Sequence, residues 1–411
     1  MTGASLLKSR SFFEESFNSL TGVPSVAVAI SGGSDSMALL RLVLDWASQL
    51  SVPPVVYALT VEHGLRSSSA LEAQRVRTWC EGLGVAHHIL PWPGAKPQTG
   101  IQAKARVARY DLLADWCKAH DVPIIVTGHT ANDQAETVAM RKLRSHTAAS
   151  LAAIWPEMKW KQVRVLRPLL DVTRRDLRAY LQSVGQEWID DPSNEDQRFE
   201  RVRIRLALKS EDVPLLVADA SQARLQVLHD RSQVLAWVTN HGRIDDFGCV
   251  WLPRQPFQAA EAALRQEIMR HGIFTAGDGE PLSTLSLVDI SAWSLKHMTG
   301  RRTLGGALVM LRRDHILVTR EAGRITGVWQ DMAKSGEMLW DGRFMVKAPS
   351  GSQVGPARLG KGMVAERGPK NLPFAVFFAL PLVKLSDGRK ILLPVAAELG
   401  VSATFCERLL A

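Results

Sequence analysis

The first stretch of the chain that could do chemistry is a short turn, Ser31-Gly-Gly-Ser-Asp-Ser36, which combines hydroxyl groups with two glycines. Glycine lets backbone N–H groups approach an anion closely, and the N-terminus of a following helix attracts negative charge. The turn is therefore predicted to hold a nucleotide's phosphates, with Asp35 as the candidate Mg²⁺ ligand. It matches neither G-x-x-x-x-G-K-[ST] nor G-x-G-x-x-G, which excludes a Walker-type loop and a dinucleotide fingerprint. The predicted phosphate contacts are Ser31, Gly32, Gly33, Ser34, Asp35 and Ser36.

A second polar stretch, His129-Thr-Ala-Asn-Asp-Gln-Ala-Glu-Thr137, contains a pair of carboxylates. Asp133 and Glu136 are three residues apart, so they share one face of the predicted helix. Such a pair suits a cationic ligand, either an amino-acid side chain or Mg²⁺, although acidic residues also cap helix N-termini. His129 is a candidate for the nucleotide site, with a purely structural histidine as the alternative.

Two further stretches are rich in arginine. Arg106 and Arg109 are three residues apart and share a helix face that could grip phosphate. Arg201 and Arg205 stand at i,i+4 in Arg198-Phe-Glu-Arg-Val-Arg-Ile-Arg205, where an aromatic residue lies among the arginines. This mixture fits contact with phosphates and bases. Taken alone, the Arg106 and Arg109 pair is better explained as a solvated helix flank.

Short apolar runs must position these groups. Residues 26–30, 55–61, 86–90 and 123–128 predict strands, and the uninterrupted apolar runs among them are typical of a parallel sheet covered on both faces. Ligands of open α/β sheets bind beyond the carboxyl ends of the strands, so both polar stretches are expected at one edge. His63 and Arg66, after the second strand, are candidates for the same nucleotide site. Residues 145–163, with Trp155 and Trp160, are expected to form a loop that could touch RNA.

The length and net charge of the chain limit its domain number and its class of partner. The 411 residues suggest two or three domains, and a net charge of +9 favours a polyanionic partner such as nucleic acid, or simply a solubilising surface. Four scattered cysteines without a C-x-x-C pair argue against a disulfide framework or a zinc or iron–sulfur site. No signal peptide or membrane-spanning run is recognisable, so a cytoplasmic location is expected. Helical spacing over 211–240 and 256–273, hairpins over 308–319 and 382–393, and a basic glycine-rich loop over 300–306 are predicted beyond residue 210.

In order, the motifs SGGSDS, HGLR, ARVARYD, GHTANDQAET, RPLL and WIDDPSN ahead of RVRIR resemble the tRNA(Ile)-lysidine synthetase family over about the first half of the chain. The resemblance implies an α/β fold, with a parallel-sheet PP-loop catalytic domain of the adenine nucleotide alpha hydrolase type over 1–210. A mainly helical tRNA-binding domain over 211–325 and a small β-rich domain over 326–411 would follow. The implied substrates are ATP with Mg²⁺, free L-lysine and tRNA(Ile) with a CAU anticodon, whose wobble cytidine becomes lysidine through an adenylated intermediate.

The resemblance also implies roles for particular residues. Asp35, Asp133, Arg109 and Arg205 become the catalytic candidates, and Asp133 and Glu136 become the candidate lysine site. His63, Arg66 and His129 join the phosphate loop as candidate ATP contacts. The candidate tRNA contacts are Arg106, Arg144, Arg201, Arg203, Arg301 and Arg302. The oligomeric state is left open, with a homodimer as one alternative.

The chain departs from the family pattern in three motifs: Asn132 replaces the first of two usual aspartates, Ser145-His-Thr147 replaces Gly-Ser-Gly, and Val202 replaces asparagine. None lies in the phosphate loop, so adenylation is expected to survive. The alternatives are a PP-loop enzyme of the 2-thiocytidine synthetase type and a non-catalytic RNA-binding protein that holds ATP. The first would call for paired cysteines, which the sequence lacks. Asp35 and the carboxylate pair argue against the second.

Overall fold

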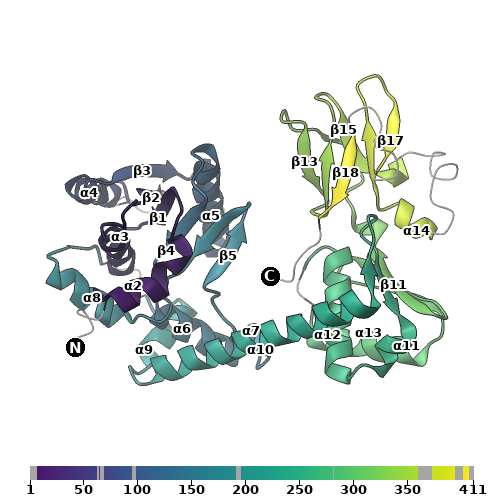
Figure 1. The fold of residues 1–411 in the computed structure, drawn as a ribbon, viewed down its shortest axis with the longest axis horizontal. Helices are drawn as coiled ribbons and strands as arrows, with labels where there is room; N and C mark the ends of the chain where they lie inside the picture. The colour runs from purple at the N-terminus through teal and green to yellow at the C-terminus, as the bar shows by residue number, and fades with distance from the viewer. Residues whose placement is uncertain are drawn as a thin grey trace. The chain divides into compact units, whose positions relative to one another are not determined.

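The computed structural model describes residues 7–62, 64, 69–94, 99–190, 196–280, 282–359, 373–393 and 401–406. It divides the chain into two compact units, Met1–Val227 and Leu228–Ala411 (Figure 1). No helix among the described residues is long and apolar enough to cross a membrane. The two units are described in turn.

The first unit is built on a six-stranded sheet in the order β3-β2-β1-β4-β6-β5. Its first four strands along the chain and β6 run parallel, and β5 is antiparallel at one edge. The predicted strands are therefore confirmed, with two more added. Their bounds are β1 Ser25–Ala29, β2 Val55–Glu62, β3 Ala86–Pro91, β4 Ile124–Thr127, β5 Glu157–Trp160 and β6 Val163–Leu166.

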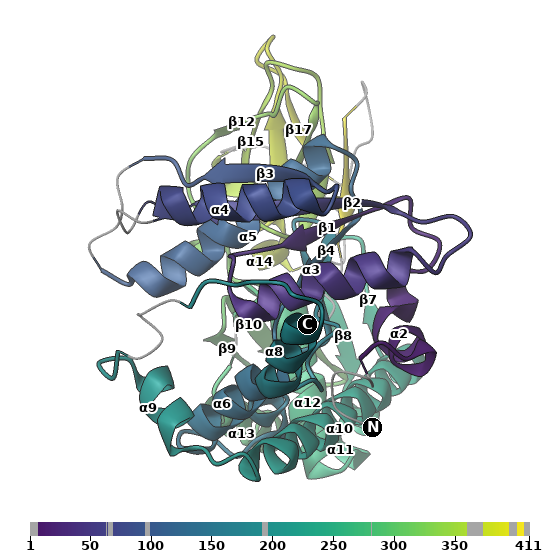
Figure 2. The ribbon, with the colours of Figure 1, turned by 90° about the vertical axis from the view of Figure 1, so that its left-hand side faces the viewer.

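Helices cover both faces of this sheet (Figure 2). Alternate residues of β1 point to opposite faces: Val26 and Val28 pack against α3 and α8, whereas Ala27 and Ala29 pack against α5. The helices of this unit are α2 Arg10–Phe17, α3 Ser34–Ala47, α4 Ser69–Gly82, α5 Ile101–Ala119, α6 Ala131–Lys142, α7 Ala148–Leu151, α8 Arg174–Ser183, α9 Glu200–Ala207 and α10 Asp212–His241, which continues into the second unit.

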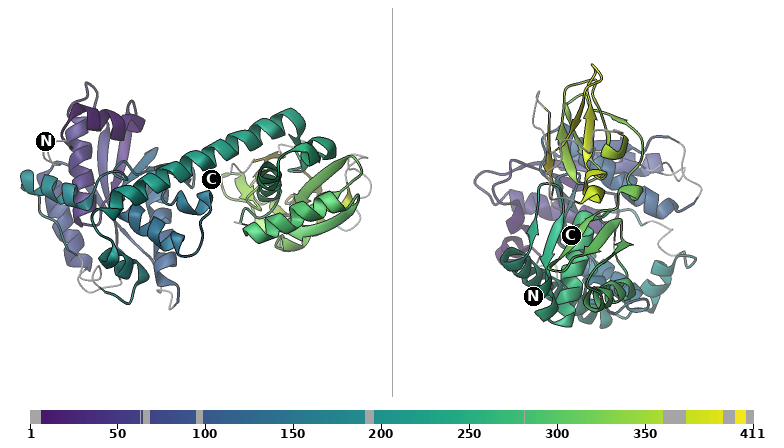
Figure 3. Two further views of the ribbon diagram at one scale, coloured as in Figure 1. Left: turned by 90° about the horizontal axis from the view of Figure 1, so that it is seen from below. Right: turned by 90° about the vertical axis from the view of Figure 1, so that its right-hand side faces the viewer.

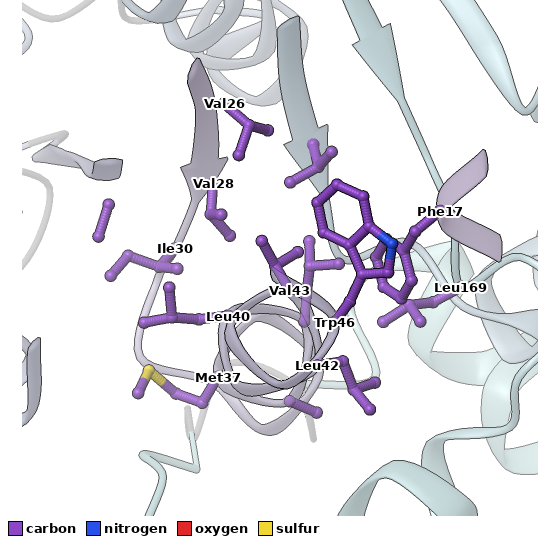
Figure 4. Close-up of a cluster of buried hydrophobic side chains, with 14 of the residues drawn as sticks. Phe17, Val26, Val28, Ile30, Met37, Leu40, Leu42, Val43, Trp46 and Leu169 are labelled. Atoms are coloured by element: carbon purple, nitrogen blue, oxygen red, sulfur yellow. The ribbon is translucent and has the colours of Figure 1, made fainter. Parts of the chain in front are cut away.

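The larger core of the unit holds α3 in place under the sheet (Figure 4). Leu40 and Val43 of α3 belong to the same buried cluster as Val28 of β1. Phe17 of α2 stacks on Trp46 with ring centroids 5.8 Å apart. Because α3 begins at Ser34, within the predicted phosphate loop, this packing fixes the position of the loop.

The expectation of a loop over residues 145–163 was wrong. That stretch contains α7 and β5, and the latter forms a hairpin with β6. Its turn residues Lys161 and Gln162 both have positive φ, 45° and 71°, as a type I′ turn requires. Trp160 donates from Nε1 to Asp111 and its ring lies 5.3 Å from that of Tyr110, so it packs within the unit.

The second unit begins with helices packed on a five-stranded antiparallel sheet, β7-β8-β11-β10-β9 (Figure 3). The predicted hairpin over 308–319 is confirmed as β10 and β11. The expected basic loop over 300–306 was wrong, because residues 300–304 form the edge strand β9. The bounds are α11 Arg254–Ala259, α12 Ala262–Ala276, α13 Thr284–Lys296, β7 Arg243–Ile244, β8 Val250–Pro253, β9 Gly300–Leu304, β10 Ala307–Leu311 and β11 His315–Arg320.

The last part of the chain is rich in strands, as expected. Its four-stranded sheet has the order β12-β15-β16-β17 and its three-stranded sheet the order β13-β14-β18. The hairpin predicted over 382–393 is confirmed as β16 and β17. The bounds are β12 Gln330–Asp331, β13 Glu337–Trp340, β14 Phe344–Lys347, β15 Gln353–Pro356, α14 Phe374–Phe377, β16 Pro381–Lys384, β17 Lys390–Leu392 and β18 Ser402–Phe405. The domain boundaries at residues 210 and 325 stay predictions.

Candidate active site

The two polar stretches lie side by side at the carboxyl edge of the sheet. β1 and β4 are parallel neighbours, with Ala29 opposite Thr127, so the loops that follow them leave the sheet at the same level. Both loops line one cavity of about 900 Å³. Its lining residues are Ser31, Gly33, Ser34, Asp35, Ser36, Arg109, Thr127, Gly128, His129, Asp133, Arg174, Arg175, Arg178, Ile189, Asp190, Arg205 and Leu206.

The loop after β1 has the shape of an anion cradle. Gly32 adopts a φ of +82°, which disfavours a side chain, and a Cβ there would stand 2.9 Å from Ile189 Cδ1. The Ser36 hydroxyl donates to the Gly33 carbonyl at 3.0 Å and accepts from the Ser31 N–H at 3.1 Å. Ser36 therefore braces the loop from inside, while the N-terminus of α3 opens toward the cavity.

The loop after β4 touches this cradle directly through Gly128. A Cβ on Gly128 would lie 2.9 Å from the Asp35 carbonyl oxygen and 3.1 Å from the Ser36 nitrogen. Both are backbone atoms in the first turn of α3. The two junctions are thus packed backbone to backbone, and only glycine allows this approach.

Asp35, Asp133 and Asp190 line the cavity and Glu136 adjoins it, and arginines of α8 and α9 pair with these four carboxylates. Arg174, the first residue of α8, donates from Nε to Asp35 Oδ2 at 2.9 Å. Its Nη2 lies 3.5 Å from Asp133 Oδ1, so it bridges the two junctions. Its backbone N–H donates to Asn132 Oδ1 at 2.8 Å. Asn132, which replaces a usual aspartate of the family pattern, therefore helps to position α8.

The carboxylate pair of α6 is held by α9. Arg201 donates from Nε to Glu136 Oε2 at 2.6 Å and from Nη2 to Asp133 Oδ1 at 2.8 Å. Arg205 donates from Nε to Glu136 Oε1 at 2.6 Å. The second Asp133 oxygen accepts from the N–H and hydroxyl of Thr130 in a capping box. The capping role of Asp133 is confirmed, because Oδ2 caps α6, while Oδ1 accepts from Arg201; its role toward a ligand stays a prediction.

Burial and these arginines set the protonation of the site. Burial raises the pKa of the Asp35 carboxyl, although Arg174 opposes this effect. Burial would also raise the pKa of Asp133, but Arg201 and Arg174 outweigh it and hold the pKa below its ordinary value. Burial lowers the pKa of His129 to about 3, so its ring is neutral at physiological pH. His129 Nδ1 lies 2.9 Å from the Thr127 hydroxyl.

The residues around Asp35 fit a magnesium ion that is shared with a nucleotide. Mg²⁺ in proteins is commonly held by one or two carboxylates together with substrate phosphates. Asp35 offers such a carboxylate at the rim of the phosphate cradle. Among the described residues there is no ready cage of three or more His, Cys, Asp or Glu side chains. The donor set thus suits an ion that arrives with phosphate.

The other predicted site residues are spread more widely. Arg109 lines the cavity from α5, and burial lowers its pKa. Arg106 lies outside the set of lining residues, with its guanidinium 5.2 Å from the Tyr110 ring centroid. His63 and Arg66 fall outside the described residues.

The remaining arginines predicted to contact tRNA lie on exposed parts of the two units. Arg144 pairs with Glu200 at 2.6 Å, and Arg203 donates to the backbone carbonyl oxygens of Gln197 and Arg198. Arg301 and Arg302 are exposed on β9 of the second unit, where Arg302 pairs with Asp289. Within the first unit, the structure brings Arg201 and Arg205 to the carboxylates, whereas Arg144 and Arg203 have other partners.

The arginines of α8 were missed from the sequence. Arg174, Arg175 and Arg178 all line the cavity, and Arg178 pairs with Asp190 at 2.5 Å. A signal was present: Arg174 and Arg175 directly follow the N-cap Thr173. Cations are unfavourable at a helix N-terminus. Two arginines there therefore indicate that anionic groups outside the helix balance their charge.

The sheet order and the hydroxyl- and glycine-rich loop after β1 define a PP-loop nucleotide-binding domain, and the family described as "PP-loop domain" matches residues 7–211. The tRNA(Ile)-lysidine synthases of Brucella suis biovar 1 (strain 1330) and Brucella melitensis biotype 2 (strain ATCC 23457) are each 37% identical to the chain over 333 residues, covering 78% of this chain and 73% of theirs. The chain belongs to the tRNA(Ile)-lysidine synthase family. A solved U34-tRNA thiolase from Methanococcus maripaludis is 16% identical with a TM-score of 0.47, covering 54% of this chain and 79% of that one, and nothing is concluded from so remote a likeness.

Proposed function

We propose that this protein is an ATP-dependent ligase that joins free L-lysine to C2 of the wobble cytidine in tRNA(Ile) with a CAU anticodon. The supporting observation is the shared cavity, in which a phosphate cradle after β1 faces a carboxylate after β4. The names of the relatives support the same substrate. A cytoplasmic location follows from such a tRNA substrate.

The first step in this proposal is adenylation of the tRNA. The cytidine O2 attacks the α-phosphorus of ATP, an O–P bond forms, and pyrophosphate leaves. The backbone N–H groups at the start of α3 and the Ser31 and Ser34 hydroxyls would hold the phosphates. A Mg²⁺ ion held by Asp35 would supply further charge neutralisation when it is bound. Arg109 and Arg205, which also line the cavity, would balance charge on the α-phosphate.

The second step is attack by lysine. The ε-amine bonds to C2 of the activated cytidine, the C2–O2 bond breaks, and AMP leaves with the oxygen. Asp133 and Glu136 would bind the incoming ammonium. Because Asp133 has a lowered pKa, it binds a cation well but is a weak base. The proton of the ammonium then passes to a carboxylate of the pair or, through a water molecule, to the bulk solvent.

The test is pyrophosphate release from ATP by the full-length protein. Release beyond one equivalent per tRNA should require both a CAU-anticodon tRNA(Ile) transcript and L-lysine, with lysine found in the RNA by mass spectrometry. Asp35→Ala should abolish release while the circular dichroism spectrum stays unchanged. Release that continues past one equivalent without lysine, or sulfur incorporation from a sulfide donor, would contradict the proposal, as would ATP binding without turnover.

A thiolation activity is further disfavoured by the state of the thiols. Burial raises the pKa of Cys80 to about 11 and that of Cys117 to about 12, so neither is a thiolate carrier at neutral pH. Neither residue lines the cavity.

A further inference from the structure

The carboxylates proposed to receive lysine are already occupied by guanidinium groups of the same chain. Both oxygens of Glu136 accept from arginine, Oε1 from Arg205 and Oε2 from Arg201, each at 2.6 Å. Asp133 Oδ1 accepts from Arg201, and Oδ2 accepts from Thr130. Each carboxylate accepts three hydrogen bonds in all and has about four acceptor sites, so an ε-ammonium with its three donors finds only about one site on each. Lysine can therefore bind fully only after a guanidinium leaves.

Arg201 is the arginine best placed to leave. It hydrogen-bonds to both carboxylates of the pair, through Nε and Nη2, whereas Arg174 approaches the same two carboxylates only at 3.5 and 3.8 Å. Its side chain is 40% exposed, compared with 27% for Arg205 and 22% for Arg174. Glu136 is only 2% exposed at the side chain, so its partners decide whether it is accessible. The exposed part of the Arg201 guanidinium stays hydrated when it is paired, so it returns to solvent more readily than the buried Glu136 carboxylate, which needs a cation beside it.

Charge balance gives the exchange a direction. In the ion-paired cluster, Asp35, Asp133 and Glu136 carry three negative charges and Arg174, Arg201 and Arg205 carry three positive ones. Arg109 and Arg175, which line the same cavity, add further positive charge. A lysine ammonium that enters this balanced cluster adds an uncompensated charge unless one guanidinium finds another anion. Phosphate is the anion that the reaction itself brings, and arginine binds it with two parallel hydrogen bonds.

We propose that Arg201 occupies the lysine site in the free enzyme and that phosphate of another substrate draws it away, so that lysine binds tightly only after that substrate. This inference rests on the proposed function. The phosphate can belong to ATP or to the tRNA backbone, and the binding experiment separates the two. In the free enzyme the open state is a minor one, and the apparent lysine affinity is reduced by its population. If Arg201 is away from the lysine site in about 1–10% of the free enzyme, the apparent affinity for lysine is about 10- to 100-fold weaker than the intrinsic affinity.

The experiment measures lysine binding, not turnover. Equilibrium dialysis with radiolabelled L-lysine is performed on the full-length protein alone, with α,β-methylene ATP and Mg²⁺, with the tRNA transcript, and with both. The wild type should bind lysine at least about tenfold more tightly when the effective phosphate ligand is present. Arg201→Ala should bind lysine tightly in every condition, so that the dependence on the phosphate ligand disappears.

The matched control is Arg198→Ala. Arg198 lies three residues before Arg201, is 86% exposed and pairs with Asp196, so its loss removes the same charge without touching Glu136. A general electrostatic effect would strengthen lysine binding similarly in both variants and would leave the phosphate dependence in place. That result overturns the inference, as does equal lysine affinity of the wild type in all four conditions.

These outcomes are distinct from failure of the proposed function. If no condition gives lysine binding and no lysine enters the RNA, the function itself is wrong. If lysine is incorporated but wild-type binding is independent of phosphate ligands, only the role of Arg201 is wrong. Circular dichroism of Arg201→Ala establishes that the variant is folded before binding is compared.

Discussion

Replacement of Gly128 by alanine should damage the active site from outside the phosphate loop. The added Cβ would stand 2.9 Å from the Asp35 carbonyl oxygen and 3.0 Å from its carbonyl carbon. These are backbone atoms in the first turn of α3, so no side chain can rotate to make room. Restoring an ordinary contact of 3.4 Å requires a shift of about half an ångström in the start of that helix.

The magnitude follows from the packing of α3. Leu40, Val43 and Trp46 are fixed in the main core, so the shift acts against a close-packed cluster and should cost about 1–3 kcal/mol of unfolding free energy. That loss corresponds to a drop of several degrees in Tm. Misplacement of reacting groups by about 1 Å can cost about 100-fold in rate, so half of that displacement should reduce kcat/KM about tenfold or more.

The assay compares Gly128→Ala with Gly82→Ala. Gly82 ends α4, and a Cβ there would meet nothing within 4 Å. The control should keep full pyrophosphate release and gain up to about 1 kcal/mol, because alanine restricts the unfolded chain. Wild-type activity and Tm in Gly128→Ala would refute the reasoning that the two junctions meet backbone to backbone.

Further outcomes can be measured on the same protein. Gly32→Ala should lose ATP binding in a fluorescent-nucleotide titration, because its φ is +82° and its Cβ would collide with Ile189; binding like the wild type would contradict the cradle geometry. His129 has a pKa of about 3 in the folded state and about 6.5 unfolded, so the unfolded chain takes up its proton first and stability falls as pH drops below 6.5. His129→Gln should therefore gain about 2 kcal/mol relative to the wild type between pH 7 and pH 5 in urea unfolding, and a constant difference would argue against a buried neutral ring. Native alkylation at pH 8 followed by mass spectrometry should modify partly exposed Cys406 well before buried Cys117, and the reverse order would count against this burial.

The location of the site could be predicted from the sequence because its cause is local. Apolar runs such as Val26–Ile30 identify buried strands, and the rule that ligands bind at their carboxyl ends brings Asp35 and Asp133 together. The partners of those carboxylates could not be predicted in the same way. Arg174 lies 139 residues after Asp35. No local sequence pattern specifies which of several arginines pairs with that carboxylate.

The fold beyond these strands was less predictable for a similar reason. The β5–β6 hairpin turns at Lys161 and Gln162, which adopt positive φ without the usual asparagine or glycine. In the second unit, β9 was not predicted as a strand because its arginines and flanking glycines are typical of a loop. Its strand is specified by pairing with β10, a tertiary contact that periodicity alone does not show.

The internal brace made by Ser36 also bears on how quickly the enzyme engages a nucleotide. Since its hydroxyl already joins the Ser31 amide to the Gly33 carbonyl, the cradle has its working shape before any ligand arrives. The loop then loses little conformational entropy when a nucleotide binds, and binding does not require the loop to fold first. Stopped-flow traces of nucleotide uptake should accordingly be single exponentials whose observed rate rises linearly with concentration.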